Sequence, residues 1–378
     1  MIRFINENIN HLMRTIGNKK LIVYGSEESM AFMLDYFAEF KLRERVDYYL
    51  NGNADSDLFK QSKYDYVMLF FNCNEFFVFS QQCQSISAKS KKARIFFYVS
   101  SFLMHQPPDY DFNKYLSSES GREKIPRTIH YCWFGGNPLP KSYERNIESW
   151  KKYCPDYEII LWNEDNFDIR KNKFISEAYD NKMWAFVSDY CRLEVMYEFG
   201  GVYTDTDVEM LQSLDKFLVH EAFAPIDCIM GYPLGGSPKS VYADISFGTF
   251  GCVKGNRIVG EIKEDISQRN FILENGTLNT APNPGINEGF KKHGLLAKNM
   301  IQKVDDFILY PTDVFIPLSP EFFPQVFTEN THVIHHYGDV AASWLSSIRT
   351  KREQAQYVID VLKSYGYENT VPVYSLGF

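Results

Sequence analysis

The chain has 378 residues, of which 45% are hydrophobic and 23% charged, and its formal net charge is −8. This is a globular composition, which excludes a largely disordered or fibrous chain. The excess of acidic residues also excludes a general nucleic-acid-binding protein, because such a protein presents a basic face to the phosphate backbone.

The chain carries no recognisable export or membrane-spanning signal. Its first twenty residues lack the apolar centre of a signal peptide, and the run IFFYVSSFLM is shorter than the about 18 residues needed to cross a bilayer. The seven cysteines (positions 73, 83, 132, 154, 191, 228 and 252) match no zinc or redox spacing, which favours a reducing compartment. We therefore expect a cytoplasmic protein. The basic cluster KSKKAR at 89–94 offers peripheral contact with the inner face of the membrane, although so short a run is more often simply solvated.

The first hundred residues alternate strand-like and helical patterns. The strand-like runs are LIVYG, VDYYL, YDYVMLFF and ARIFFYV, and the helical patterns lie near 28–41 and 74–90. The turn YGSEES has one glycine where a dinucleotide-binding turn has three, so it is a weak nucleotide signal. A link rich in Pro, Ser, Gly and charge follows at 105–124. We predict a small Rossmann-like α/β domain over 1–120 and a second domain over 121–378.

The second domain repeats the strand and helix alternation. The order is strand (RTIHYCWF), turn (GGNPLP), helix (SYERNIESWKKY), strand (YEIILWN), a long helical stretch to about Phe199, and strand (GVYTDTD). Further on come the strand THVIHHY and a helix from about Trp344 to Lys363. This succession predicts a mostly parallel sheet with helices on both faces. Ligands gather at the carboxyl ends of such strands, where WFGG and TDTD both lie.

Two aspartates stand at the end of the strand GVYTDTD. Strand side chains alternate with period two, so Asp205 and Asp207 are expected to point the same way and to form one anionic site. Carboxylates suit Mg²⁺ or Mn²⁺ and leave coordination positions open for a diphosphate. An isolated Asp-x-Asp is more often a solvated turn.

The neighbouring sequence strengthens the metal-diphosphate hypothesis. Asp189 and Arg192 are three residues apart and share one face of the preceding helix. Trp133 ends a strand and is followed by Phe-Gly-Gly, which lets the backbone approach a ligand closely. Taken alone, these features are a surface ion pair and a core tryptophan.

Together, IPRTIHYCWFGGNPLP, the LWN strand, SDYCRLEVMYEFGGVYTDTDVE and HHYGDVAASW resemble glycosyltransferase family 32, whose more distant relatives are the glucosylating clostridial toxins. The resemblance covers about 125–345. It implies a GT-A type fold and a retaining, Mn²⁺- or Mg²⁺-dependent transfer of a hexose or N-acetylhexosamine from a nucleoside-diphosphate sugar. A UDP-sugar donor is favoured, with a glycan or lipid-linked acceptor in bacterial surface polysaccharide synthesis.

The resemblance also assigns roles to individual residues. Trp133 matches the tryptophan that stacks on the base, and Tyr203 matches a tyrosine near the nucleotide. Asp189 and Arg192 match the pair that contacts the donor sugar and diphosphate. Asp205 matches the acid that bridges the ribose or sugar of the donor and the metal-bound water, and Asp207 matches the direct metal ligand. The expected catalytic set is Asp189, Arg192, Asp205 and Asp207.

The C-terminal part of the motif departs from the family pattern. His335 and His336 are candidate metal ligands, and Ser343 and Trp344 are candidate donor-binding residues. Extra residues between the histidines and Ser343 leave open whether His335, His336, Asp339 or Ser343 completes the metal site.

The expected chemistry is neutralisation of the departing diphosphate by the metal and Arg192. No carboxylate is identifiable as a nucleophile, which favours front-face substitution. Two alternatives stay open: a glycoside hydrolase, whose two acids flank the sugar, and a non-catalytic nucleotide-sugar-binding or metal-binding module. Ser246 or Thr249 could reach the donor sugar, although satisfied core hydroxyls are the simpler interpretation. The segment 279–290 is either an acceptor-binding turn or the start of an ordinary helix.

Overall fold

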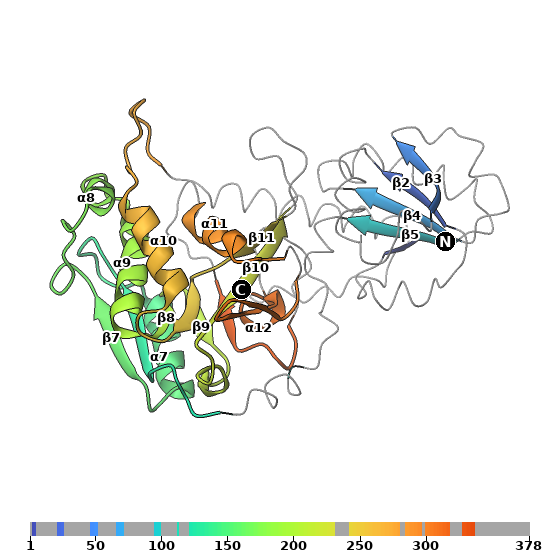
Figure 1. Ribbon diagram of the computed structural model, residues 1–378. Coiled ribbons are helices and arrows are strands. Elements are labelled where there is room, and N and C mark those ends of the chain that lie inside the picture. Colours follow the sequence, from blue (N-terminus) through green and yellow to red (C-terminus); the bar gives the residue numbers. More distant parts are fainter. Residues whose placement is uncertain are drawn as a thin grey trace.

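The computed structural model describes residues 121–230, 242–279, 284–296, 299–317 and 327–336, together with Phe112 and five strands within the first hundred residues (Figure 1). The helices predicted at 28–41, 74–90 and 344–363 lie outside these residues. Among the residues described, no helix is both long and apolar enough to cross a membrane.

The N-terminal strands form one parallel sheet with the order β1-β5-β4-β2-β3. The four strand-like runs of the sequence are confirmed, and a short first strand joins them. The strands are β1 (Ile2–Phe4), β2 (Leu21–Gly25), β3 (Val46–Asn51), β4 (Tyr66–Phe71) and β5 (Arg94–Val99). The boundary near residue 120 stays a prediction.

An eight-stranded sheet forms the centre of the second half, with the order β13-β14-β10-β12-β8-β6-β7 and β11 paired to β10. Strands β7, β6, β8, β10 and β14 run in one direction, and β12 runs the opposite way between β8 and β10. The predicted α/β class with a mostly parallel sheet is therefore confirmed. The strands are β6 (Thr128–Cys132), β7 (Glu158–Trp162), β8 (Gly201–Thr204), β10 (Ala222–Met230), β11 (Tyr242–Ile245), β12 (Thr249–Cys252), β13 (Gln302–Val304) and β14 (Phe307–Tyr310).

Helices pack on both faces of this sheet and bury two separate cores. One core joins α9 and α10 to one face, and the other contains Trp150 of α7 and the facing residues of β8 and β14. Alternation along β8 divides its side chains between them, since Tyr203 belongs to the first core and Val202 to the second. The helices are α7 (Lys141–Tyr153), α8 (Lys173–Asp180), α9 (Trp184–Phe199), α10 (Arg257–Ser267), α11 (Pro284–Lys292) and α12 (Thr312–Phe315).

The predicted long helix before the Asp-x-Asp segment is in fact two helices, α8 and α9. The helical conformation is interrupted between them, where Lys182 has a positive φ of 58°. Helix α9 then ends at Gly200 and Gly201, with φ of 70° and 110°. A Cβ on Gly200 would lie 2.6 Å from the backbone nitrogen of Lys254, so this turn into β8 requires glycine for both space and conformation.

A two-stranded sheet brings His335 and His336 to the end of β8. It pairs β9 (Val208–Met210) antiparallel to β15 (Val333–His335), with His335 opposite Val208. The backbone N–H of His336 donates to the carbonyl oxygen of Asp207 at 2.9 Å. Residues far apart in the sequence therefore meet beside the Asp-x-Asp segment.

Candidate active site

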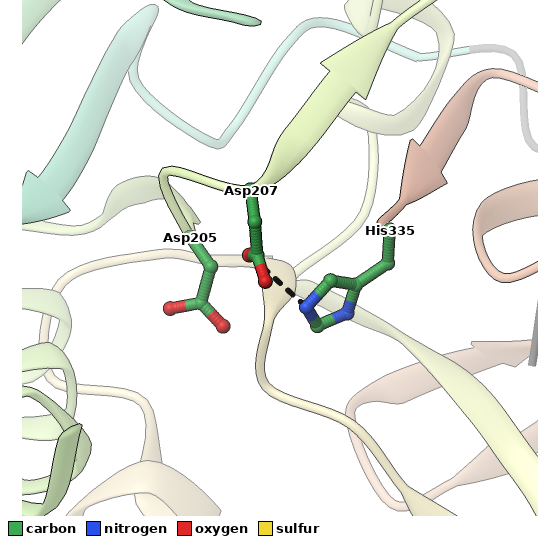
Figure 2. A group of neighbouring side chains, drawn as sticks. All are labelled: Asp205, Asp207 and His335. Atoms are coloured by element: carbon green, nitrogen blue, oxygen red, sulfur yellow. Dashed lines mark ion pairs between the residues drawn. The ribbon is translucent and has the colours of Figure 1, made fainter. Parts of the chain in front are cut away.

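Asp205, Asp207 and His335 form a compact cluster at the carboxyl end of β8. One ligand atom from each residue lies within 4.8 Å of the others. Figure 2 shows the three side chains converging, with Nε2 of His335 3.2 Å from Oδ1 of Asp207. Two carboxylates and one imidazole match the donor preferences of Mn²⁺ and, for the oxygens, Mg²⁺. The chemistry of this donor set therefore fits a divalent cation.

The two aspartates converge through a turn and not through the predicted strand pleat. Strand β8 ends at Thr204, and the N–H of Val208 donates to the carbonyl oxygen of Asp205 at 3.1 Å. The N–H of Asp205 donates to the carbonyl oxygen of Gly248 at 2.7 Å. The prediction that Asp205 and Asp207 share one site agrees with the cluster, although the reason given for it was wrong.

Arg192 connects this cluster to α9. Its Nη2 lies 2.7 Å from Oδ1 of Asp189 and 3.2 Å from Oδ1 of Asp205. Its Nη1 donates to the carbonyl oxygen of Phe247 at 3.0 Å, and its guanidinium carbon lies 4.8 Å from the ring centre of Tyr203. Arg192 is only 6% exposed, so it is a fixed charge and not a mobile surface side chain.

Tyr203 fixes the orientation of Asp205 from the side of the hydrophobic core. Its hydroxyl donates to Oδ1 of Asp205 at 2.9 Å, and its ring is buried in the core shared with α9. The structure therefore brings the predicted residues Asp189, Tyr203 and Asp205 together around the guanidinium of Arg192. This arrangement leaves the Oδ2 side of Asp205 toward His335 and Gly248.

The electrostatics of the cluster favour a bound cation. Burial raises the pKa of Asp189 to about 6 against the opposing effect of Arg192, and burial likewise raises the pKa of Asp205. Burial alone would lower the pKa of His335, but Asp207, by its charge and hydrogen bond, outweighs it and raises that pKa to about 9. A carboxylate pair that retains a proton on a partly buried imidazole attracts positive charge strongly.

Gly248 is a site residue that the sequence did not indicate. A Cβ at this position would lie 2.7 Å from Cε1 of His335 and 3.0 Å from both its Nδ1 and Oδ2 of Asp205. The imidazole and the carboxylate therefore occupy the space that any side chain here would need. A glycine between two strands has many ordinary explanations, and only the tertiary contacts distinguish this one.

Trp133 lies directly after β6 and is partly exposed. Its Nε1 donates to the carbonyl oxygen of Asn137 at 2.6 Å, and its ring meets Tyr143 edge-on at 5.8 Å. The following loop is tightly held, because the N–H of Gly135 donates to Oε1 of Glu164 at 2.7 Å. A partly exposed, oriented ring at a strand end is compatible with base stacking.

The remaining predicted site residues divide into two groups. His336 is not part of the cluster, since its Nε2 lies 3.0 Å from Oε2 of Glu209. Ser343 and Trp344 lie outside the described residues, as does Asp339.

The hydroxyls considered as donor-sugar contacts have partners within the protein. Thr249 is buried and its hydroxyl pairs with that of Thr204 at 3.1 Å. The hydroxyl of Ser246 accepts from the N–H of Gly248 at 3.1 Å. Thr249 and Ser246 therefore fit the simpler interpretation, in which each hydroxyl is hydrogen-bonded within the protein.

Comparison with known proteins identifies the segment that carries most of this site. Residues 140–224 match the family model described as "Glycosyltransferase sugar-binding region containing DXD motif". This segment is therefore similar to a glycosyltransferase sugar-binding region. It includes Asp189, Arg192, Tyr203, Asp205 and Asp207, and it excludes Trp133 and His335.

Curated relatives share part of the chain. "Inositol phosphoceramide mannosyltransferase 1" of Schizosaccharomyces pombe is 29% identical over 124 residues, covering 30% of this chain and 37% of the relative. "Inositol phosphoceramide mannosyltransferase 2" of the same yeast is 29% identical over 168 residues, covering 41% and 46%. The matches thus span less than half the length of these relatives. The solved structure titled "PaToxG Glycosyltransferase" matches with a TM-score of 0.33 and 16% identity, covering 48% of this chain and 75% of that chain.

These relatives are yeast proteins named for mannosyl transfer to a ceramide lipid. The predicted role in bacterial surface polysaccharide synthesis and the preference for UDP-sugars therefore stay predictions.

Proposed function

We propose that this chain is a metal-dependent glycosyltransferase that moves a hexosyl group from a nucleoside-diphosphate sugar to a hydroxyl group of a glycan or lipid-linked acceptor. The observation that carries the proposal is the cluster of Asp205, Asp207 and His335 next to the buried Arg192. A cation site beside a fixed guanidinium is suited to a diphosphate, because both neutralise charge that develops on the leaving group. The family match at 140–224 supports the same conclusion.

The residues have separate roles in this proposal. Asp207 and His335 would hold Mn²⁺ or Mg²⁺, with Asp205 beside them; the bound metal would supply Lewis-acid stabilisation of the departing diphosphate. Arg192 presents a permanent positive charge to the same group, and its ion pair with Asp189 fixes its direction. Asp189 also offers a hydrogen-bond acceptor to donor-sugar hydroxyls.

Trp133 would bind the nucleobase by stacking, one strand away from the cluster. Retention of configuration with front-face attack remains part of the proposal, because the resemblance that implied it concerns the same residues. For the sugar, the names of the yeast relatives add mannose to the UDP-hexoses favoured by the sequence, and they add an inositol-phosphate lipid to the acceptors.

The hydrolase alternative fits the geometry less well. Hydrolases place two carboxyls on opposite sides of the scissile bond, about 5–10 Å apart. Asp205 and Asp207 instead converge with His335 on one common point. A non-catalytic binding module would keep the same cluster, and measured turnover separates it from an enzyme.

The test is turnover of a panel of UDP- and GDP-sugars with Mn²⁺, in the wild type and in Asp207→Asn. This substitution conserves volume and removes the charge of one proposed metal ligand. Loss of a residue that only hydrogen-bonds to a metal ligand costs about 10–100-fold, so we expect loss of a ligand charge to lower turnover by at least about 100-fold. Glu209→Gln is the matched control, because Glu209 pairs with His336 outside the cluster. Full activity in Asp207→Asn, or in excess chelator, would refute a metal-dependent transferase.

A further inference from the structure

Helix α7 presents three hydrogen-bonding side chains to the segment that carries the metal-site aspartates. Asn146, Ser149 and Trp150 are spaced i, i+3 and i+4, so they lie on one face of the helix. Asn146 and Trp150 are buried, and Ser149 is partly buried. Polar groups at this depth need partners, because an unpaired buried donor costs free energy. Their partners are backbone groups within residues 206–210.

The bonds from α7 reach every second residue of this segment. They are Nδ2 of Asn146 to the carbonyl oxygen of Thr206 at 2.9 Å, Nε1 of Trp150 to the carbonyl oxygen of Val208 at 2.7 Å, and the N–H of Met210 to the hydroxyl of Ser149 at 2.9 Å. The residues at and beside β15 bond instead to the backbone of Asp207 and Leu211. Backbone groups of alternate residues point to opposite edges of a strand. The face of α7 therefore takes the place of a neighbouring strand along the free edge of β9.

Thr206 stands between the two aspartates of the site. The backbone of Asp205 is bonded to the segment before β12, and the backbone of Asp207 is bonded to the residue after β15. These two contacts join backbone groups, whereas the contact to Thr206 is made by the side chain of Asn146. A single substitution can therefore remove it without changing the segment itself.

The bond from Asn146 acts on the direction of the second aspartate. The carbonyl of Thr206 and the N–H of Asp207 belong to one planar peptide group. Rotation of this group changes φ of Asp207, and with it the direction in which the carboxylate leaves the turn. Because Oδ1 of Asp207 lies 3.2 Å from Nε2 of His335, that direction also sets the separation of the two proposed ligands.

We propose that Asn146 is a positioning residue, which aims the carboxylate of Asp207 at the cation by holding the peptide group between the two aspartates. The inference rests on the proposed function, because it requires Asp207 to be a metal ligand. Asn146 acts through the backbone of Thr206 and does not itself bind the cation.

The experiment titrates the full chain with Mn²⁺ alone and follows free Mn²⁺ by electron paramagnetic resonance at one neutral pH. Asn146→Ala removes the amide donor, and Asn146→Leu removes it while keeping a side chain of similar shape. Both variants should bind Mn²⁺ about 10-fold more weakly or worse, within the range of about 10–100-fold typical of residues that orient metal ligands. Thermal unfolding of the metal-free proteins shows whether each variant is folded.

Ser149→Ala is the matched control. It removes a hydrogen bond between the same face of α7 and β9, but at Met210, three residues beyond Asp207. Its unfolding temperature should fall as that of Asn146→Ala does, and its Mn²⁺ affinity should equal that of the wild type.

Unchanged Mn²⁺ affinity in both Asn146 variants, or an equal loss in Ser149→Ala, would overturn the positioning role and leave the proposed function intact. So would unfolding of both Asn146 variants under conditions in which Ser149→Ala is folded, because Asn146 would then serve the fold as a whole. A wild-type chain that binds no Mn²⁺ would overturn the proposed function as well.

Discussion

Replacing Gly248 with alanine should damage the cation site far more than the fold. The added Cβ would lie 2.7 Å from Cε1 of His335 and 3.0 Å from Oδ2 of Asp205. Carbon atoms in contact are about 3.5–4.0 Å apart, so the imidazole must move by roughly 1 Å. Misplacement of that size in a site costs about 100-fold, whereas overpacking costs roughly 1–3 kcal/mol of stability.

The assay combines Mn²⁺ titration with thermal unfolding. For Gly248→Ala, we expect Mn²⁺ affinity and donor turnover to fall about 100-fold while the protein stays folded. The matched control is Gly260→Ala in α10, where the added Cβ would lie 2.7 Å from the ring of Tyr197. That variant meets an overlap of the same size away from the site, so its stability changes and its Mn²⁺ affinity does not. Wild-type Mn²⁺ affinity in Gly248→Ala would refute the argument that His335 must occupy this space.

Two further predictions concern the donor. Trp133→Ala should weaken nucleoside diphosphate binding by about 1–3 kcal/mol. Trp133→Phe should weaken it by less, because phenylalanine keeps an aromatic face. Equal binding by the wild type and both variants, measured by calorimetry, would contradict base stacking. Because burial raises the pKa of Asp189 to about 6, acidification through that pH protonates the carboxylate, weakens the ion pair that fixes the direction of Arg192 and impairs the proposed acceptor for donor-sugar hydroxyls. Donor affinity should therefore fall as the pH drops through about 6. The variant Asp189→Asn is already neutral, so its donor affinity should not change in this pH range. The same fall in that variant would exclude Asp189 as the cause.

Local periodicity was sufficient to predict that Asp189 lies beside Arg192 and Asp205 near Asp207. Asp189 and Arg192 are three residues apart on α9, and the helix places them together whatever the rest of the fold does. Asp205 and Asp207 are separated by one residue and meet by either a strand or a turn. Residues so close in sequence lie near one another even when the predicted end of a strand is wrong.

The other side of the site depends on pairings between distant segments. Whether His335 or His336 joins the cluster is decided by the register of β15 on β9, which puts His335 opposite Val208 and leaves His336 beside Glu209. Adjacent strand residues face opposite ways, so the sequence HH contains both outcomes. Gly248 is likewise defined by what the fold places beside it, the ring of His335 and the carboxylate of Asp205. The break between α8 and α9 escaped prediction because Lys182 adopts a positive φ, which is rare for lysine.

The charges of the site give a physical reason to expect that a cation stabilises the folded state. Asp189, Asp205 and Asp207 gather around one permanent cation, Arg192, and one imidazole, His335. The uncompensated negative charge costs free energy on folding, and a divalent ion that binds only the folded chain offsets it. Mn²⁺ at a hundred times its dissociation constant should stabilise the protein by about 2.7 kcal/mol, which corresponds to a rise of roughly 3–5 °C in Tm for a protein of this size. Differential scanning fluorimetry measures the rise, and an equal rise in Asp207→Asn would show that the ion binds elsewhere.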